Sequence, residues 1–164
     1  MGEIVELTRG VYTFKRSPYM VVKALPMSYV GLGSAALIHG ASTQVTALTV
    51  LSPLVSAAVR GGERVVCGYK VLLRRISPKM YFGYDLVRLR EIDEWIRVST
   101  PEKTLIDAIY LRYPLLDEIA PGLLRMTDER RLRGYLETMR ERGVKGARRV
   151  EAALRGVGLE IETR

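Results

Sequence analysis

The sequence predicts an α+β fold, with an antiparallel sheet meander packed with short helices and followed by a C-terminal helical segment. In the first two thirds of the 164 residues, several segments alternate apolar and polar side chains, as strands do. In the last third, apolar residues recur at helical spacing. This length and a hydrophobic content of 48% suit one domain. We expect residues 1–114 to form its α+β part and residues 115–164 a basic helical segment.

Local patterns predict the N-terminal elements in turn. Residues 4–14 alternate on both sides of a glycine, which predicts two strands and a turn. Residues 17–25 begin with Ser-Pro, a pair that suits the cap and first position of a short helix. The small side chains of residues 33–38 predict a tightly packed helix, and residues 45–51 predict a buried strand.

The middle of the chain predicts the rest of the sheet. Residues 64–76 alternate over their whole length and predict one strand, with Val65, Cys67 and Tyr69 on its apolar face. Residues 81–90 and 95–98 predict two further strands. Because these strands follow one another closely, we expect an antiparallel meander with one solvated, basic face.

The clearest helix start lies at the end of this sheet. Thr100 can cap the helix and Pro101 suits its first position. This helix should end before Pro114, and a loop is expected around Pro121. Two further helices, which open at Thr127-Asp128 and at Lys145, should complete the C-terminal segment.

The charge of the chain favours an anionic partner. Lys and Arg number 26 against 18 Asp and Glu, a net charge of +8 with a pI near 9.8. A basic strand face near aromatic residues would suit nucleic acid, through Arg74, Arg75, Lys79, Arg88 and Arg90. The C-terminal helices would suit a partner protein, through Arg130, Arg131, Arg148 and Arg149. An ordinary solvated face explains the strand residues equally well. The chain has no Asn and one Gln, a thermophile-like bias, and a composition of that kind explains arginine enrichment without a ligand.

Few residues are suited to catalysis. Cys67 is the only cysteine and His39 the only histidine, which excludes a disulfide framework and a histidine-rich or cysteine-based metal site. The one combination that suits a metal-dependent nuclease is Asp85 with Glu102 and Lys103, although capping and ion pairing explain Glu102 more simply. We therefore expect no catalytic residue, no cofactor and no metal.

One uncharged stretch must be weighed against a membrane span. Residues 24–59 carry no Asp, Glu, Lys or Arg, but glycine, proline and hydroxyl side chains interrupt them, so a buried helix and strand fit better. The first residues lack the apolar run of a secretory signal. We expect a cytoplasmic protein without a membrane segment.

Three stretches together resemble the AbiEi antitoxin family of transcriptional regulators. They are Arg-Gly-Val-Tyr at residues 9–12, residues 28–40, and Ser-Thr-Pro-Glu-Lys-Thr-Leu-Ile-Asp at residues 99–107. The most specific piece is Pro-Glu-Lys, followed by Leu105 and Asp107. The matching positions are Tyr12, Ser34, His39, Gly40, Glu102, Lys103 and Asp107.

The resemblance implies an antitoxin of a type IV toxin-antitoxin system, paired with a nucleotidyltransferase-like toxin and repressing its own operon. In that family the Arg-Gly-Val-Tyr element follows a winged helix, whereas here it begins at Arg9. The chain is then either part of a longer regulator or a stand-alone antitoxin-like domain. We expect a non-enzymatic regulator that binds nucleic acid or an acidic partner. The alternative is a protein that neutralises the toxin directly through its C-terminal helices. Lys103 and Asp107 should form an ion pair one turn apart.

Overall fold

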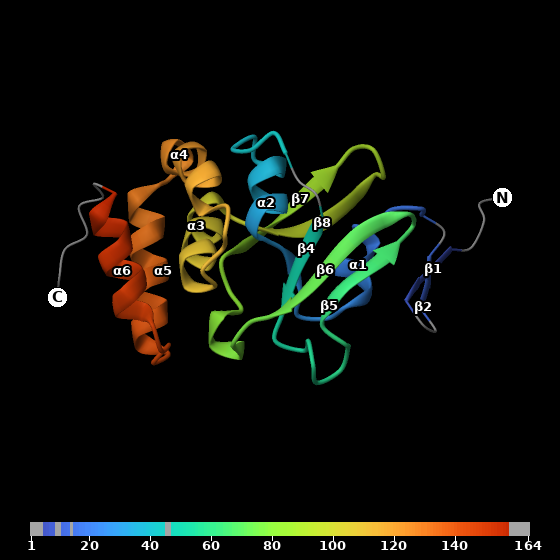
Figure 1. The fold of residues 1–164 in the computed structure, drawn as a ribbon, viewed down its shortest axis with the longest axis horizontal. Helices are drawn as coiled ribbons and strands as arrows, with labels where there is room; N and C mark the ends of the chain where they lie inside the picture. The colour runs from blue at the N-terminus through green and yellow to red at the C-terminus, as the bar shows by residue number, and fades with distance from the viewer. Residues whose placement is uncertain (1–4, 9–10, 14, 45–46, 158–164) are drawn as a thin grey trace.

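The computed structural model describes residues 5–8, 11–13, 15–44 and 47–157. A six-stranded mixed sheet stands beside a group of helices from the C-terminal third, which confirms the α+β class (Figure 1). A separate hairpin of β1 (Val5–Thr8) and β2 (Val11–Thr13) confirms the predicted N-terminal strand pair. Its turn at residues 9–10 lies outside the described residues.

The main sheet has the order β5-β6-β4-β3-β8-β7. Its strands are β3 (Tyr29–Val30), β4 (Leu48–Ser52), β5 (Gly62–Val66), β6 (Tyr69–Arg75), β7 (Tyr84–Leu89) and β8 (Glu94–Ser99). The pairs β3–β8 and β4–β6 are parallel, and the other three are antiparallel. The expectation of a purely antiparallel meander is therefore wrong. The alternation within a strand sets its two faces, but it does not determine which distant strand pairs with it.

The predicted strand over residues 64–76 is in fact the β5–β6 hairpin. Cys67 and Gly68 form its two-residue turn, with φ angles of 52° and 80°. Positive φ at both positions matches the twist of the flanking strands, and glycine adopts it without strain. Cys67 therefore lies in the turn and not within a strand. Val65 and Tyr69, placed on the apolar face by the sequence pattern, are 71% and 62% exposed.

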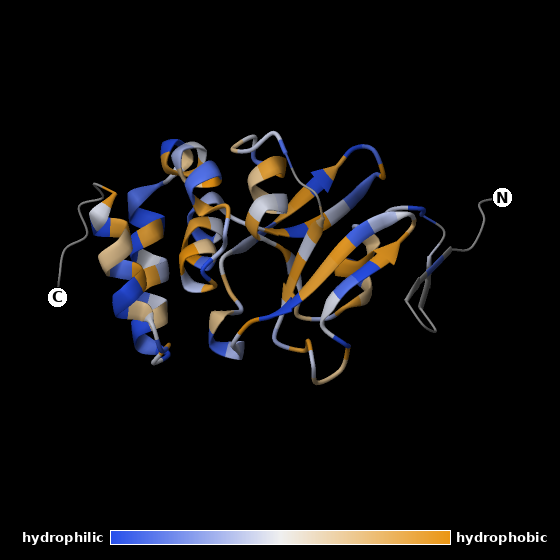
Figure 2. Ribbon diagram, viewed as in Figure 1, coloured by the Kyte–Doolittle hydropathy of each residue, from blue (hydrophilic) through white to orange (hydrophobic). Residues whose placement is uncertain are grey.

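Two apolar clusters flank the sheet. Val30 and Val50 belong to the cluster that includes residues of α1 (Met20–Ala24), whereas the adjacent Tyr29 and Leu51 pack with residues of the C-terminal helices. Neighbouring residues of a strand point to opposite faces, so the sheet separates the clusters. In Figure 2, β4 and β6 are largely hydrophobic, while α5 carries many hydrophilic residues.

The remaining helices are α2 (Leu32–Ile38), α3 (Pro101–Tyr110), α4 (Leu116–Met126), α5 (Glu129–Glu141) and α6 (Ala147–Gly156), with a 3₁₀ turn η1 (Pro78–Met80). The predicted cap of α3 is confirmed, because Thr100 Oγ1 accepts from the Lys103 amide at 3.2 Å. The starts of α5 and α6 also agree with the sequence pattern. Within the described ranges, no helix is long and apolar enough to cross a membrane.

Helix α4 occupies the position where a loop was expected. Pro121 lies inside it and removes one backbone hydrogen bond. Buried Ile119 and Leu123 compensate by joining the core. At Gly122 an added Cβ would lie 2.8 Å from Cα of Ala41. The glycine therefore allows α4 to pack directly against the chain that follows α2.

Candidate nucleic-acid interface

The family-motif lysine lies at the centre of a buried polar network. Lys103 Nζ donates to Asp107 Oδ1, to the Tyr29 hydroxyl and to the Met80 carbonyl, each at 2.8 Å. The Tyr29 hydroxyl donates to Asp107 Oδ2 at 2.7 Å. All three side chains are fully buried. The expected ion pair between Lys103 and Asp107 is confirmed, in a place that solvent does not reach.

Burial sets the electrostatics of this network. It lowers the pKa of Lys103 and raises that of Asp107, and in each case the partner's charge opposes the effect. Burial and the Asp107 charge hold the pKa of Tyr29 well above its usual range. The Lys103 ammonium also lies 4.6 Å from the centre of the Phe82 ring, a cation–π contact. The network is satisfied internally and offers no open position to a ligand.

Other motif residues also connect elements of the fold. Glu102 Oε1 accepts from the Asp128 amide at 2.8 Å, which ties α3 to the start of α5. His39 Nε2 lies 2.7 Å from the Ser99 carbonyl. Gly40 has a φ of 81° at the end of α2. Arg9, Gly10 and the side chain of Tyr12 lie outside the described residues.

The residues considered for a metal-dependent nuclease do not form one open site. Asp85 is exposed on the edge strand β7, whereas Glu102 is 1% exposed and the Lys103 ammonium is enclosed by its three partners. Among the described residues, no group of three His, Cys, Asp or Glu side chains is placed to hold a metal ion. The structure therefore adds no geometric support to the nuclease hypothesis.

Five cations from three separate segments lie around α3, and we call them the basic patch: Arg74, Lys79, Arg142, Lys145 and Arg149. In Figure 1, η1 and the α5–α6 loop both lie on the lower side of the molecule. There Lys79 Nζ lies 3.5 Å from the Gly143 carbonyl, and Arg142 donates to the Lys79 carbonyl at 3.3 Å.

Two guanidinium groups hold this patch against α3. Arg74 donates to the Leu111 carbonyl at 2.7 Å. Arg149 donates to the carbonyls of Ile109 and Tyr110, both at 2.9 Å. A helix C-terminus carries partial negative charge, so these contacts are favourable. Carbonyl groups are neutral, however, and leave the full charge of each arginine in place.

The cations of the basic patch are not paired with acidic side chains. None of the five forms an ion pair within the described part of the chain. Lys79, Arg142 and Lys145 are exposed. Several unpaired cations on one rigid surface produce a positive potential that attracts a polyanion.

The structure divides the predicted nucleic-acid residues into two groups. Arg74 and Lys79 belong to the basic patch, whereas Arg75, Arg88 and Arg90 do not. Arg75 leaves β6 on the sheet face opposite to Arg74, and Arg88 and Arg90 lie on or just after β7. Strand β7 is four positions from β6 in the sheet, roughly 19 Å at the usual strand spacing. Arg88 also pairs with Asp93 at 2.6 Å. The predicted single basic sheet face is therefore not formed.

The four predicted partner-binding arginines also differ in the contacts that they make. Arg149 caps α3, and Arg131 lies 3.9 Å from Glu102. Arg130 and Arg148 are exposed, with no ion pair to a residue in the described ranges. Sequence reasoning did not assign Arg142 and Lys145 to the nucleic-acid surface. The nearby Gly143 and Gly146 indicate a tight turn between helices, but not what the turn packs against.

No family model matches the chain. Among curated proteins, none is significantly similar to it.

Proposed function

We propose that this protein is a non-enzymatic, cytoplasmic regulator of the antitoxin type that binds nucleic acid through the basic patch. The observation that carries the proposal is the gathering of five cations, unpaired with acids in the described ranges, from β6, η1 and the α5–α6 region. A regulator of this kind needs a surface that attracts phosphates.

The patch combines fixed and adaptable cations. Arg74 and Arg149 are held by backbone carbonyls, so their position costs little further ordering on binding. Lys145 is exposed and forms no hydrogen bond through its side chain within the described part of the chain, and exposed Lys79 has one long contact of 3.5 Å, to the Gly143 carbonyl. Both are free to follow the phosphates of a bound strand.

Duplex binding by charge-reversed variants tests the proposal. Binding to promoter DNA and to unrelated DNA is measured for Lys79→Glu/Lys145→Glu and for the matched control Arg60→Glu/Arg90→Glu. Both variants change the net charge equally at exposed positions. We expect the first to lose at least roughly tenfold in affinity and the control to lose much less, because only the first removes phosphate contacts. Equal losses would reject the basic patch as the binding surface.

A second candidate is direct binding to a nucleotidyltransferase-like toxin, and the β7–β8 hairpin favours it. Trp95 is 58% exposed and Leu86 is 61% exposed. Leu86 pairs with Arg97, two residues from Trp95, so both apolar side chains lie on the same face. Exposed tryptophan is the residue type that most often dominates a protein interface. This surface differs from the C-terminal helices expected from the sequence.

Co-expression with a nucleotidyltransferase encoded beside this chain tests the second candidate. Trp95→Ala should abolish co-purification while DNA binding is retained. If Trp95→Ala still co-purifies with the toxin and Arg130→Glu/Arg148→Glu does not, the toxin contacts the C-terminal helices and not the β7–β8 hairpin.

A further inference from the structure

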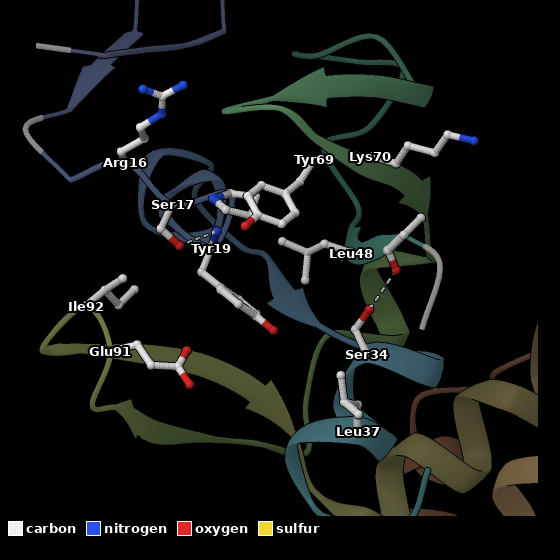
Figure 3. Close-up of a pocket in the computed structure, with 12 residues that line it drawn as sticks. Arg16, Ser17, Tyr19, Ser34, Leu37, Leu48, Tyr69, Lys70, Glu91 and Ile92 are labelled. Atoms are coloured by element: carbon white, nitrogen blue, oxygen red, sulfur yellow. Dashed lines mark hydrogen bonds between the residues drawn. The ribbon is translucent and has the colours of Figure 1, made fainter. Parts of the chain in front are cut away.

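A cavity of about 500 Å³ opens far from the basic patch (Figure 3). Tyr69 and Lys70, at the start of β6, line it, whereas Arg74 and Arg75 end the same strand. The other walls come from the segment before α1, from α2 and from the β7–β8 turn. Its volume lies in the range that small ligands occupy.

Hydrogen bonds fix the walls of this cavity. Lys15 Nζ donates to the Ile92 carbonyl at 2.8 Å and pairs with Glu94 at 2.8 Å, which ties the segment before α1 to the β7–β8 turn. Ser34 Oγ accepts from the Thr49 amide at 2.9 Å and so holds α2 against β4. The cavity is therefore formed before any ligand arrives.

Aromatic and acidic groups line the cavity, and two of them, Tyr69 and Glu91, are exposed at the surface. In Figure 3 the Tyr69 ring lies above the apolar side chain of Leu48, the Tyr19 ring lies to the lower left of Leu48, and the Glu91 carboxylate is directed toward the Tyr19 ring. Burial, followed by the Glu91 charge, raises the pKa of Tyr19. In the described ranges, the Glu91 carboxylate has no ion pair and the Tyr19 hydroxyl has no hydrogen bond. Both groups are available to a ligand.

Two cations stand at the mouth of the cavity. Arg16 and Lys70 lie on different sides of it, and their charged ends point away from the tyrosines (Figure 3). Both side chains are exposed. Exposed side chains change rotamer within nanoseconds, so either one can turn toward a bound anion.

Simple ions fit this set of groups poorly. A cation would pair with Glu91 but would meet Arg16, Lys70 and a chain of net charge +8. A small anion would be repelled by Glu91. A ligand that suits the tyrosine rings, the Glu91 carboxylate and the two cations together has a flat ring, N–H donors on that ring, and a separate negative group.

We propose that the cavity binds a nucleoside phosphate. The base stacks on Tyr69 and Tyr19, and its amino group donates to Glu91. The phosphate lies at the mouth, where Arg16 and Lys70 turn inward to meet it.

Calorimetric titration of the full chain with AMP, CMP, GMP and UMP tests this assignment, with ribose 5-phosphate and inorganic phosphate as references. We expect saturable binding of nucleoside monophosphates, strongest for those with an exocyclic amino group. Tyr69→Ala and Lys70→Ala should each weaken binding by about tenfold. The matched control Arg90→Ala, an exposed cation outside the cavity, should leave binding unchanged. Glu91→Ala, which removes the acceptor, should remove the preference for amino-bearing bases over UMP.

Three outcomes would overturn the proposal: no binding up to millimolar ligand, equal affinity for inorganic phosphate, or equal loss in Tyr69→Ala and Arg90→Ala. Tyr69 and Lys70 are exposed, so their variants should fold, and far-ultraviolet circular dichroism checks this. Duplex DNA binding by the basic patch should be unaffected in Tyr69→Ala. Failure of one proposal is therefore distinguishable from failure of the other.

Discussion

Lys103 and Lys79 lie close together in the fold but in opposite surroundings. The Lys103 ammonium donates to the carbonyl of Met80, the residue after Lys79, and is fully buried against Asp107 and Tyr29. Lys79 is exposed in the basic patch and contacts only a backbone carbonyl within the described ranges. Lys103 belongs to the most recognisable motif of the chain, yet its surroundings are those of a core residue. The surface suited to binding is built from residues that no single motif contains.

The largest expected effect comes from removing the buried cation. Lys103→Met leaves Asp107 buried without its ion-pair partner, and we expect this to lower the free energy of unfolding by about 3–5 kcal/mol. The control Lys79→Met, an exposed lysine, should change it by less than about 0.5 kcal/mol. Urea denaturation measures both. A small loss in Lys103→Met, comparable to that of Lys79→Met, would contradict the structural role of the network. Lys103→Met/Asp107→Leu should recover part of the loss, because it leaves no buried charge.

Tyr29→Phe should have an intermediate effect. It removes the hydroxyl that donates to Asp107 and accepts from Lys103, which we expect to cost about 1–3 kcal/mol of unfolding free energy. The raised pKa of Tyr29 adds a pH test. A raised folded pKa stabilises the fold below the ordinary value of 10.0, and this contribution is lost as the pH rises through the folded pKa. Alkaline denaturation curves should show this component in the parent chain and not in Tyr29→Phe.

The ion pairs of Glu94 are partly exposed, and we expect their loss to have a smaller effect on stability. Its carboxylate pairs with Lys15 and Lys23, which lowers its pKa from 4.5 to about 2. A lowered folded pKa stabilises the fold above pH 4.5, and this contribution is lost as the pH falls toward about 2. Thermal unfolding across that range should depend less on pH in Glu94→Gln. An unchanged pH dependence would mean that the pair contributes nothing measurable.

The smallest expected effect on stability belongs to the basic patch. Lys79→Ala/Lys145→Ala should change the free energy of unfolding by less than about 0.5 kcal/mol, because both side chains are exposed and their one hydrogen bond in the described part of the chain is a long contact of 3.5 Å. Chemical denaturation checks this value. A larger loss would show that the patch supports the fold, which would weaken the contrast with Lys103.

Local chemistry predicted much of the fold. The Thr100 cap, the starts of α5 and α6 and the N-terminal hairpin follow from residue types at fixed spacings. The β5–β6 turn was missed because the alternation continues across Cys67 and Gly68, and because only the glycine signals the turn. Helix α4 was missed because Pro121 usually marks a loop, and its cost is offset by tertiary packing that no local pattern reports.

The candidate site was less predictable than the fold. The ion pair of Lys103 and Asp107 was foreseen from their spacing of one helical turn. Their partner Tyr29 lies 74 residues before Lys103, and a distant contact of this kind leaves no local signal. The same holds for the contact of Lys79 with Gly143 in the basic patch. Arg88 and Arg90 were grouped with Arg74 because the strand order could not be read from the sequence.

The central claim is that exposed cations of the basic patch contact phosphates, and the salt dependence of DNA affinity tests it most directly. For a polyanion contact, the logarithm of the binding constant falls linearly with the logarithm of salt concentration. Removing two phosphate contacts in Lys79→Ala/Lys145→Ala should reduce the magnitude of that slope by about 2. The control Arg60→Ala/Arg90→Ala should leave the slope unchanged. A slope equal to that of the parent chain in both variants would contradict the account.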